Sequence, residues 1–261
     1  MSVLDLFDLT GKVALITGGA RGLGRQAALA LAEAGADVAI CDLLEKESRE
    51  TRREITALGR RALSAVVDVT CSDQIASFVT QIVDELGGID ILVNNAGMPS
   101  SGRPLEDEDD ETWRRMIDTN LSGMFYVGKA VAQQMIARDS GGVIINVASI
   151  NSFIISNILP RHNVPYCVSK GGVAQLTRGM ASDWAPYRIR ANAVAPGYML
   201  TAQTANSRSY PEIVERLTAN TPMKRYGQEQ EIKGTIVYLA SDASSFMTGS
   251  IVVLDGGTTI W

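Results

Sequence analysis

Three residues capable of acid–base chemistry stand close together in this chain. Ser149 ends the segment NVAS, and Tyr166 and Lys170 form a Tyr-x3-Lys pair. Four positions apart, the tyrosine and the lysine share one face if this stretch is helical. A free tyrosine has a pKa of about 10 and is a poor base at neutral pH, but a nearby ammonium stabilises its phenolate. On an ordinary helix the same pair would be a surface contact without a chemical role.

The elements that must position these residues follow from the hydrophobic pattern. Short apolar runs predict strands at 13–17, 37–42, 63–68, 89–94, 142–149, 188–196 and 250–257. Segments with helical spacing predict helices at 22–35, 45–59, 72–86, 110–138, 165–184 and 228–241. Apolar strands that alternate with helices indicate an α/β protein, with a parallel sheet covered on both faces. We therefore predict a single domain over 1–261, with Ser149 at the carboxyl edge of the sheet, where such folds bind ligands.

A glycine-rich turn follows the first predicted strand. Gly18, Gly22 and Gly24 stand in a G-x3-G-x-G spacing before a run rich in Ala and Leu. Backbone N–H groups of such a turn can approach a pyrophosphate, whose charge the amino end of the next helix favours. Asp42 ends the second strand, where a carboxylate accepts hydrogen bonds from the adenosine ribose and repels a 2′-phosphate. Arg21 is the opposing signal, since it could reach that phosphate. We predict NAD as the cofactor, with NADP the less favoured choice.

Composition excludes several classes of function. Of 261 residues, 46% are hydrophobic and 20% charged, with a formal net charge of −5 and no basic stripe, so nucleic acid is an improbable partner. No apolar run reaches the ~20 residues of a membrane span. The first residues, MSVLDLFDLTGK, lack the apolar core of a signal peptide, and we expect a cytoplasmic protein. Three scattered cysteines and one histidine form no metal-ligand set, and the acidic run 106–111 predicts a helix start rather than a metal site.

Taken together, these motifs resemble those of the short-chain dehydrogenase/reductase family of the classical type, over essentially the whole chain. The matching motifs are Thr17-Gly18-x3-Gly22-x-Gly24, Asn94-Asn95-Ala96-Gly97, Asn120, Ser149, Tyr166-x3-Lys170 and Pro196-Gly197. The resemblance implies a Rossmann fold, a doubly wound seven-stranded parallel sheet with helices on both faces. It also implies a homotetramer in which the helices at 110–138 and 165–184 pack between subunits. A Thr- and Ala-rich stretch at about 198–227 predicts a lid over cofactor and substrate.

The resemblance further implies a mechanism that suits the residue chemistry. Tyr166 would be the general acid in reduction and the base in oxidation. Lys170 would lower the tyrosine pKa and bond the nicotinamide ribose, while Ser149 would hold the substrate oxygen. Asn120 would support a proton relay through water to Lys170. Hydride would pass directly between cofactor and carbon, without a metal. The implied cofactor contacts are Gly18, Arg21, Gly22, Leu23, Gly24, Asp42, Leu43, Asp68, Val69, Asn95, Ala96, Gly97, Tyr166, Lys170, Pro196, Gly197, Met199 and Thr201. A competing interpretation makes Asp68 a strand-end cap.

The chain departs from the family pattern between the serine and the tyrosine. Sixteen residues separate Ser149 from Tyr166, more than the family usually has. Either Ser149 is the catalytic serine and a longer loop follows, or Ser152 takes that role; we favour Ser149 because it directly follows the strand. The loop carries polar side chains that could bond substrate hydroxyls or a carboxylate, or could form a solvated bend or a subunit contact. The predicted substrate contacts are Ser149, Asn151, Arg161, His162 and Tyr198.

Three functions are compatible with these residues. The leading hypothesis is an NAD(H)-dependent oxidoreductase that interconverts a secondary alcohol and a ketone, and the polar loop favours a polyol, sugar or sugar acid as substrate. The alternative is an NADPH-dependent 3-oxoacyl-thioester (acyl carrier protein) reductase, which Arg21 favours and Asp42 opposes. A non-catalytic dinucleotide-binding regulator is the third hypothesis, but such a protein could dispense with Tyr166 or Lys170, and both are present.

Overall fold

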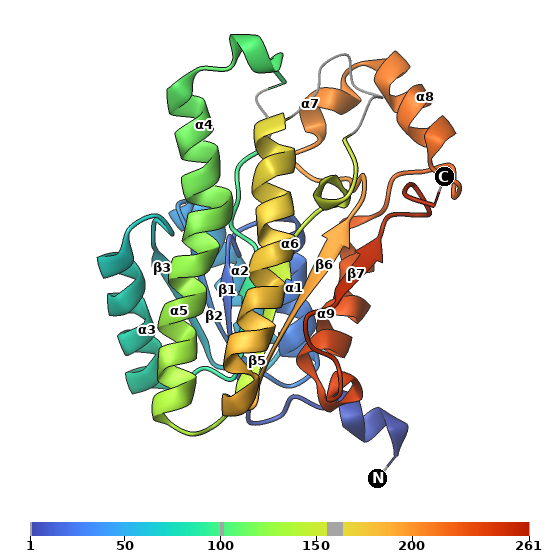
Figure 1. Ribbon diagram of the computed structural model, residues 1–261. Coiled ribbons are helices and arrows are strands. Elements are labelled where there is room, and N and C mark those ends of the chain that lie inside the picture. Colours follow the sequence, from blue (N-terminus) through green and yellow to red (C-terminus); the bar gives the residue numbers. More distant parts are fainter. Residues whose placement is uncertain (1, 100–101, 156–163, 261) are drawn as a thin grey trace.

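Seven parallel strands form one sheet in the computed structural model, which describes residues 2–99, 102–155 and 164–260 (Figure 1). The strands are β1 (Val13–Thr17), β2 (Asp37–Asp42), β3 (Ala62–Val66), β4 (Ile91–Asn94), β5 (Gly142–Val147), β6 (Ile189–Pro196) and β7 (Ile251–Leu254). They hydrogen-bond in the order β3-β2-β1-β4-β5-β6-β7, and every neighbouring pair is parallel. The predicted single-domain α/β fold with seven parallel strands is confirmed.

Helices cover both faces of this sheet. They are α1 (Gly22–Glu33), α2 (Glu45–Ala57), α3 (Ser72–Leu86), α4 (Asp110–Ile117), α5 (Gly123–Ala137), α6 (Val164–Trp184), α7 (Ala205–Arg208), α8 (Pro211–Asn220) and α9 (Lys233–Ala240). One apolar core joins the strands to α1, α2 and α9, and a second joins them to α3, α5 and α6 (Figure 1). Burial from both sides explains why the central strands are apolar throughout. Within the described ranges, no helix is both long and apolar enough to span a membrane.

The helix expected over 110–138 is interrupted in its middle. Asp109 begins α4 by accepting a hydrogen bond from the backbone N–H of Thr112, as the acidic run predicts. A π-helical turn, Asp118–Ser122, then separates α4 from α5. Asn120 lies in this turn, fully buried, and its carboxamide hydrogen-bonds both the N–H and the carbonyl of Met98. One wider turn thus directs a polar side chain inward at this point, as π-turns at functional sites commonly do.

Two other predicted elements are shorter than expected. The strand predicted at 250–257 ends at Leu254, because the Asp255 carboxylate accepts hydrogen bonds from the N–H groups of Gly257 and Thr259 and turns the chain. The helix predicted at 228–241 is divided into a short 3-10 helix, η6 (Glu229–Ile232), and α9. Neither change alters the layer order of the fold.

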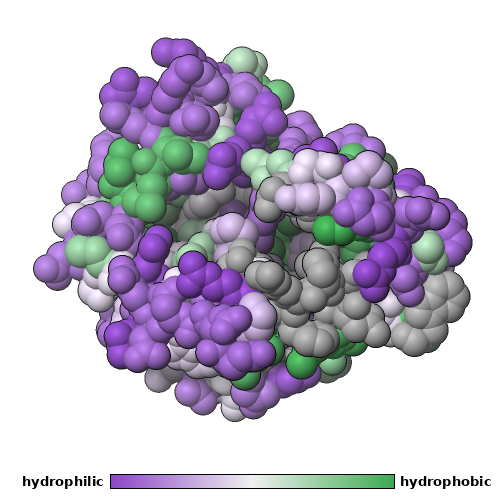
Figure 2. Space-filling model, turned by 90° about the horizontal axis from the view of Figure 1, so that it is seen from above, coloured by the Kyte–Doolittle hydropathy of each residue, from purple (hydrophilic) through white to green (hydrophobic). Residues whose placement is uncertain are grey.

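The strand order places a crevice at one edge of the sheet. From β1 the chain proceeds outward through β2 to β3, and it then returns to β4 on the opposite side of β1. Ligands bind in open α/β sheets at such a reversal, outside the carboxyl ends of the strands. Figure 2 looks onto this end of the molecule and shows a hollow bordered largely by hydrophilic side chains. Beside it, α7 and α8 form a separate small layer above β6 (Figure 1).

Candidate active site

The glycine turn between β1 and α1 is shaped by close backbone contacts. A Cβ on Gly24 would lie 2.1 Å from the carbonyl oxygen of Gly18, so no larger residue fits there. Gly18 and Gly22 have φ values of +65° and +58°, in the left-handed region that glycine adopts readily. A Cβ on Gly22 would meet nothing closer than 3.9 Å. The turn is therefore tight on its inner side and open on its outer side, as a backbone cradle for a pyrophosphate requires.

The turn after β4 is fastened to the glycine turn. The Thr17 hydroxyl accepts hydrogen bonds from the backbone N–H groups of Asn95 and Ala96, both at 3.0 Å. The Asn95 amide donates to the carbonyls of Thr17 and Gly18, at 3.1 and 3.0 Å. Asn95 thus holds the two turns together, so its side chain has a structural role at the predicted cofactor site. Gly97 follows, where a Cβ would lie 3.1 Å from Asn120 Oδ1.

The predicted adenosine side of the site carries Asp42 at the end of β2. Its carboxylate accepts from the backbone N–H groups of Ala20 and Leu44, both at 3.1 Å, and therefore lies directly beside the glycine turn. Leu43 is exposed next to it. Arg21, at the amino end of α1, is exposed as well. Two backbone N–H donors thus hold the Asp42 carboxylate in place, whereas the Arg21 side chain is exposed to solvent.

Asp68 and Val69 follow β3 on the same side. One oxygen of Asp68 accepts from both the N–H and the hydroxyl of Thr70, at 2.8 and 2.7 Å, so the carboxylate does cap the end of the strand. The capping interpretation of Asp68 is therefore realised in the structure. Val69 is buried, and its side chain lies against Gly123 at the start of α5.

Ser149 and Tyr166 meet at the carboxyl edge, where β5 ends and α6 begins. The side chain of Ser149 hydrogen-bonds the Tyr166 phenol, as does the side chain of Gln203. Lys170 lies one helical turn along α6, with its Nζ 5.7 Å from the centre of the Tyr166 ring. That Nζ donates to the carbonyl oxygen of Val147 at 2.7 Å. The structure brings together the serine, tyrosine and lysine that the sequence analysis selected.

Burial governs the protonation of this group. It raises the pKa of Tyr166 above its ordinary value, and the hydrogen bonds from Ser149 and Gln203 offset only part of the rise. Burial lowers the pKa of Lys170 from 10.5 to about 8. Lys170 is therefore an ammonium at neutral pH, but that ammonium contacts the Val147 carbonyl. The predicted lowering of the tyrosine pKa by Lys170 stays a prediction.

Two serines competed for the catalytic role, and their surroundings differ. The Ser152 hydroxyl donates to the backbone carbonyl of Lys170 at 2.7 Å, and so ties the turn after β5 to α6. The Ser149 hydroxyl accepts from the Asn151 N–H at 3.1 Å and also bonds Tyr166. Asn151 Oδ1 is buried without a hydrogen-bond partner among the residues with described positions. An unsatisfied buried acceptor of this kind is suited to a donor brought by a ligand.

Asn120 lies deeper, between α4 and α6. Besides Met98, its amide contacts the Ser169 hydroxyl at 3.3 Å, and Ser169 in turn donates to the carbonyl of Tyr166. Asn120 is thus linked to the helix that carries the tyrosine through one intervening serine. The predicted water relay to Lys170 stays a prediction.

The remaining predicted contacts occupy the segments after β6. Gly197 has no room for a side chain, since a Cβ would lie 2.8 Å from Cα of Asp255, and Pro196 ends β6 beside it. Met199 is buried and pairs with Gly227. Tyr198 stacks edge to face on Tyr226 within the small core beneath α8. Arg161 and His162 lie outside the described residues, so these two predictions stay open.

Sequence reasoning missed two residues of the site. Gln203 reaches the Tyr166 phenol from the segment between β6 and α7. Glu229 lies across from Gly22, beside Thr201. Neither belongs to a motif, and only the return of distant segments to one edge of the sheet reveals them.

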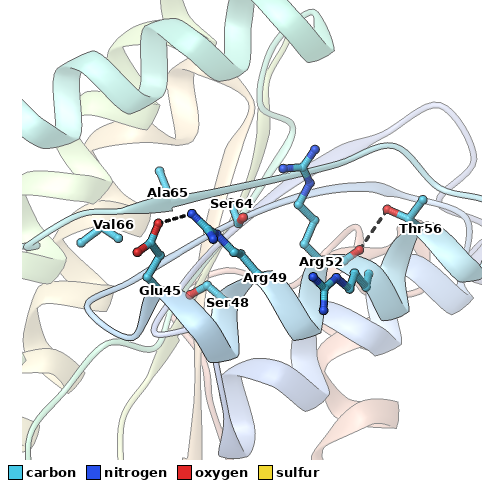
Figure 3. A pocket seen from close by; sticks show the side chains of 9 residues that line it. Glu45, Ser48, Arg49, Arg52, Thr56, Ser64, Ala65 and Val66 are labelled. Carbon is cyan, nitrogen blue, oxygen red and sulfur yellow. Dashed lines mark hydrogen bonds and ion pairs between the residues drawn. The ribbon is translucent and has the colours of Figure 1, made fainter.

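A second hollow lies away from this edge, between α2 and the outer strand β3 (Figure 3). Its lining residues are Glu45, Ser48, Arg49, Arg52, Arg53, Thr56, Ser64, Ala65 and Val66. Two of these residues, Arg49 and Glu45, form an ion pair. This hollow contains none of the predicted catalytic residues, so the candidate chemistry belongs to the carboxyl edge.

Comparisons with known proteins agree with this fold. A family model described as enoyl-(acyl carrier protein) reductase matches residues 18–259. A gluconate 5-dehydrogenase from Gluconobacter oxydans is 39% identical over 100% of this chain and 99% of its own length. The crystal structure of a short-chain type dehydrogenase/reductase from Mycobacterium marinum is 43% identical, with a TM-score of 0.94 and 99% of each chain covered. A gluconate 5-dehydrogenase from Burkholderia cenocepacia, solved in complex with NADP and tartrate, is 39% identical, with a TM-score of 0.93 and 100% of each chain covered.

Proposed function

The chain belongs to the short-chain dehydrogenase/reductase family, and from that premise we propose that it interconverts a secondary alcohol and a ketone in a polyol or sugar acid, with a nicotinamide cofactor. The observation that carries this proposal is the meeting of Ser149, Tyr166 and Lys170 at the same carboxyl edge of the sheet as the glycine turn. Each side chain alone is ordinary. Their convergence at the carboxyl edge, next to a cradle open on its outer side, fits a dinucleotide and a small alcohol together.

In this proposal, each residue of the group has one task. Ser149 donates its hydroxyl hydrogen to the substrate oxygen and so fixes the reacting carbon. Tyr166 takes the hydroxyl proton in oxidation and returns it in reduction, from the same phenol oxygen. The nicotinamide ring, when bound, supplies the hydride acceptor or donor. Lys170 is an ammonium at neutral pH, and a shift of its Nζ from the Val147 carbonyl toward the phenolate would favour proton removal.

The substrate class is supported by polar groups close to Ser149 and Tyr166. Gln203 offers both a donor and an acceptor beside Tyr166, and Asn151 offers a buried acceptor that lacks a donor among the described residues. A compound with several hydroxyls can satisfy such groups, whereas a simple alcohol leaves them unpaired. The gluconate 5-dehydrogenase of Gluconobacter oxydans, by its name, acts on a sugar acid and is 39% identical. We extend that substrate class to this chain, and Arg161 and His162 stay candidate contacts.

We further propose that NAD is preferred over NADP. Asp42 is held beside the glycine turn by two backbone N–H groups, so its charge is fixed where a 2′-phosphate would approach. The Burkholderia cenocepacia relative was solved with NADP, and Arg21 could assist that cofactor here. Asp42→Ala should therefore lower the KM for NADP about tenfold or more while raising that for NAD.

The test is a cofactor-reduction assay with gluconate, polyols and simple secondary alcohols, run with NAD and NADP in parallel. Tyr166→Phe should reduce turnover by about 10²- to 10⁴-fold and leave cofactor binding intact. Tyr187→Phe, at an exposed tyrosine distant from the site, is the matched control. Unchanged turnover in Tyr166→Phe would refute the assigned mechanism. Cofactor binding without turnover of any substrate would instead favour a regulator.

Arg21 favours one other candidate, an NADPH-dependent reductase of 3-oxoacyl thioesters. The same assay decides between the two when a 3-oxoacyl thioester is added with NADPH. Faster reduction of the thioester than oxidation of any polyol would replace the sugar-acid assignment and keep the roles of Ser149 and Tyr166.

We also propose that α4, α5 and α6 carry subunit contacts of a homotetramer. Trp113, Phe125 and Val168 expose apolar side chains on these helices, at 37%, 41% and 45% of their full surface. Light scattering of the purified protein measures the assembly directly, and a monomeric mass would contradict this proposal.

A further inference from the structure

Glu229 places a carboxylate against the glycine turn. It is the first residue of η6, which packs on α1. A Cβ on Gly22 would lie 3.9 Å from Glu229 Oε1 and 4.0 Å from Thr201 Cβ. The carboxylate therefore borders the open outer side of the turn, on the side where Thr201 approaches.

This carboxylate is not neutralised by the basic residues near it in the chain. Arg225 donates to both oxygens of Glu231, each at 2.7 Å. Lys233 donates to Glu33 at 2.7 Å. Glu229 itself is half-buried, and the described part of the chain offers its carboxylate neither a hydrogen bond nor an ion pair. A half-buried charge is screened less by salt than a fully exposed one.

The negative charge of Glu229 is unfavourable for the negatively charged ligand that the glycine turn is suited to bind. The amino end of α1, which begins in the turn, favours a negative ligand. A carboxylate at the outer side repels the same ligand, and neutralising it removes the repulsion without touching the backbone that binds. Where the dielectric is that of water, as at the open side of the turn, one unit charge acting on another about 4 Å away changes an equilibrium by about five- to tenfold.

We propose that Glu229 weakens dinucleotide binding by repelling the pyrophosphate, and thereby speeds the exchange of oxidised and reduced cofactor between turnovers; this rests on the proposed function. A dehydrogenase must release one form of its cofactor and bind the other in each cycle, and release steps commonly limit kcat. The charge of Glu229 shortens the time for which either form of the cofactor stays bound.

The experiment compares wild type with Glu229→Gln, using nicotinamide fluorescence to measure the Kd of NADH and stopped flow to measure its dissociation rate. The variant should bind NADH about five- to tenfold more tightly at low salt, and less than about twofold more tightly in ~0.5 M NaCl. Its dissociation rate should fall correspondingly. ADP-ribose, which keeps the pyrophosphate, should show the same gain, and adenosine, which lacks it, should show none.

Two control variants separate this role from a structural one. Glu111→Gln removes one exposed charge from α4 and should leave the Kd of NADH unchanged. Glu229→Asp keeps the charge and should bind NADH within about twofold of wild type. Equal or weaker binding of NADH by Glu229→Gln, or an equal gain for adenosine, overturns the role of Glu229 while the dehydrogenase function stands. Absence of NADH binding to every protein overturns both proposals.

Discussion

Lys170 is predicted to destabilise the fold that it serves. Its side chain is 4% exposed, and its ammonium has the Val147 carbonyl, at 2.7 Å, as its hydrogen-bond acceptor. Burial lowers the pKa of Lys170 from 10.5 to about 8, which corresponds to a cost of about 3 kcal/mol for holding the charged form in the folded chain. Lys170→Met removes this cost and loses one hydrogen bond worth about 1 kcal/mol. We therefore expect the variant to be more stable than wild type by about 2 kcal/mol at pH 7, and inactive.

The pH dependence of the effect follows from the direction of the pKa change. Below pH 8, folded and unfolded chains both carry the proton on Lys170, and the full cost applies. As the pH rises from 8 toward 10.5, the folded chain releases its proton first, so the stability of wild type increases. Methionine has no proton to release. The advantage of Lys170→Met should therefore shrink by about 2 kcal/mol between pH 7 and pH ~9.5.

Urea unfolding of both proteins at the two pH values measures this difference. Lys46→Met, at an exposed lysine on α2, is the control and should change the comparison by less than about 0.5 kcal/mol. An advantage of Lys170→Met that is independent of pH would show that packing, rather than the buried charge, causes it. Lower stability of the variant at pH 7 would refute the reasoning entirely.

Three further predictions concern the glycine turn, Arg190 at the start of β6, and the phenol of Tyr166. Gly24→Ala should lower the free energy of unfolding in urea by about 2 kcal/mol or more and abolish NADH binding, because the new Cβ would lie 2.1 Å from the Gly18 carbonyl oxygen. Gly179→Ala is the control: its new Cβ would meet no atom within 4 Å, so the variant should be as stable as wild type. Arg190→Ala should lower unfolding free energy by about 2–4 kcal/mol, since the guanidinium donates to three carbonyls and a serine hydroxyl. Gln203→Ala should move the limb of the pH–rate profile for oxidation to higher pH, because its hydrogen bond lowers the pKa of Tyr166; an unmoved limb would contradict that contact.

The sequence predicted the sheet and the glycine turn because their signals are local. A strand buried on both faces must be apolar at every position, and β1 is buried at all five of its residues. The glycine spacing reflects contacts between residues only a few positions apart, such as Gly18 and Gly24. The start of α4 was also readable, since Asp109 caps a helix whose first turn lies beside it in the chain.

The parts that could not be predicted depend on segments distant in sequence. The π-turn places the Asn120 side chain against Met98, 22 residues away, a contact that no local pattern reveals. The contact of Gln203 with Tyr166 requires two loops to meet. The pKa of Tyr166 also depends on packing, because burial raises it, and packing places the Lys170 ammonium against the Val147 carbonyl. Burial and ammonium position are properties of the packed molecule, and no spacing in the chain encodes them.

The hydrogen bonds between Asn95 and Thr17 also bear on how the chain folds during synthesis. The strands β1, β2 and β3 come from the first part of the chain, and β4 to β7 come from the remainder. The hydrogen bonds that join the two turns span 77 to 79 residues, so this contact closes a long loop, and we expect it to form late in folding. During synthesis, the glycine turn therefore emerges well before the segment that fixes its shape. A nascent chain can complete the turn only after the segment that carries β4 has joined the first three strands. A nucleotide that binds the completed turn then stabilises this joined state.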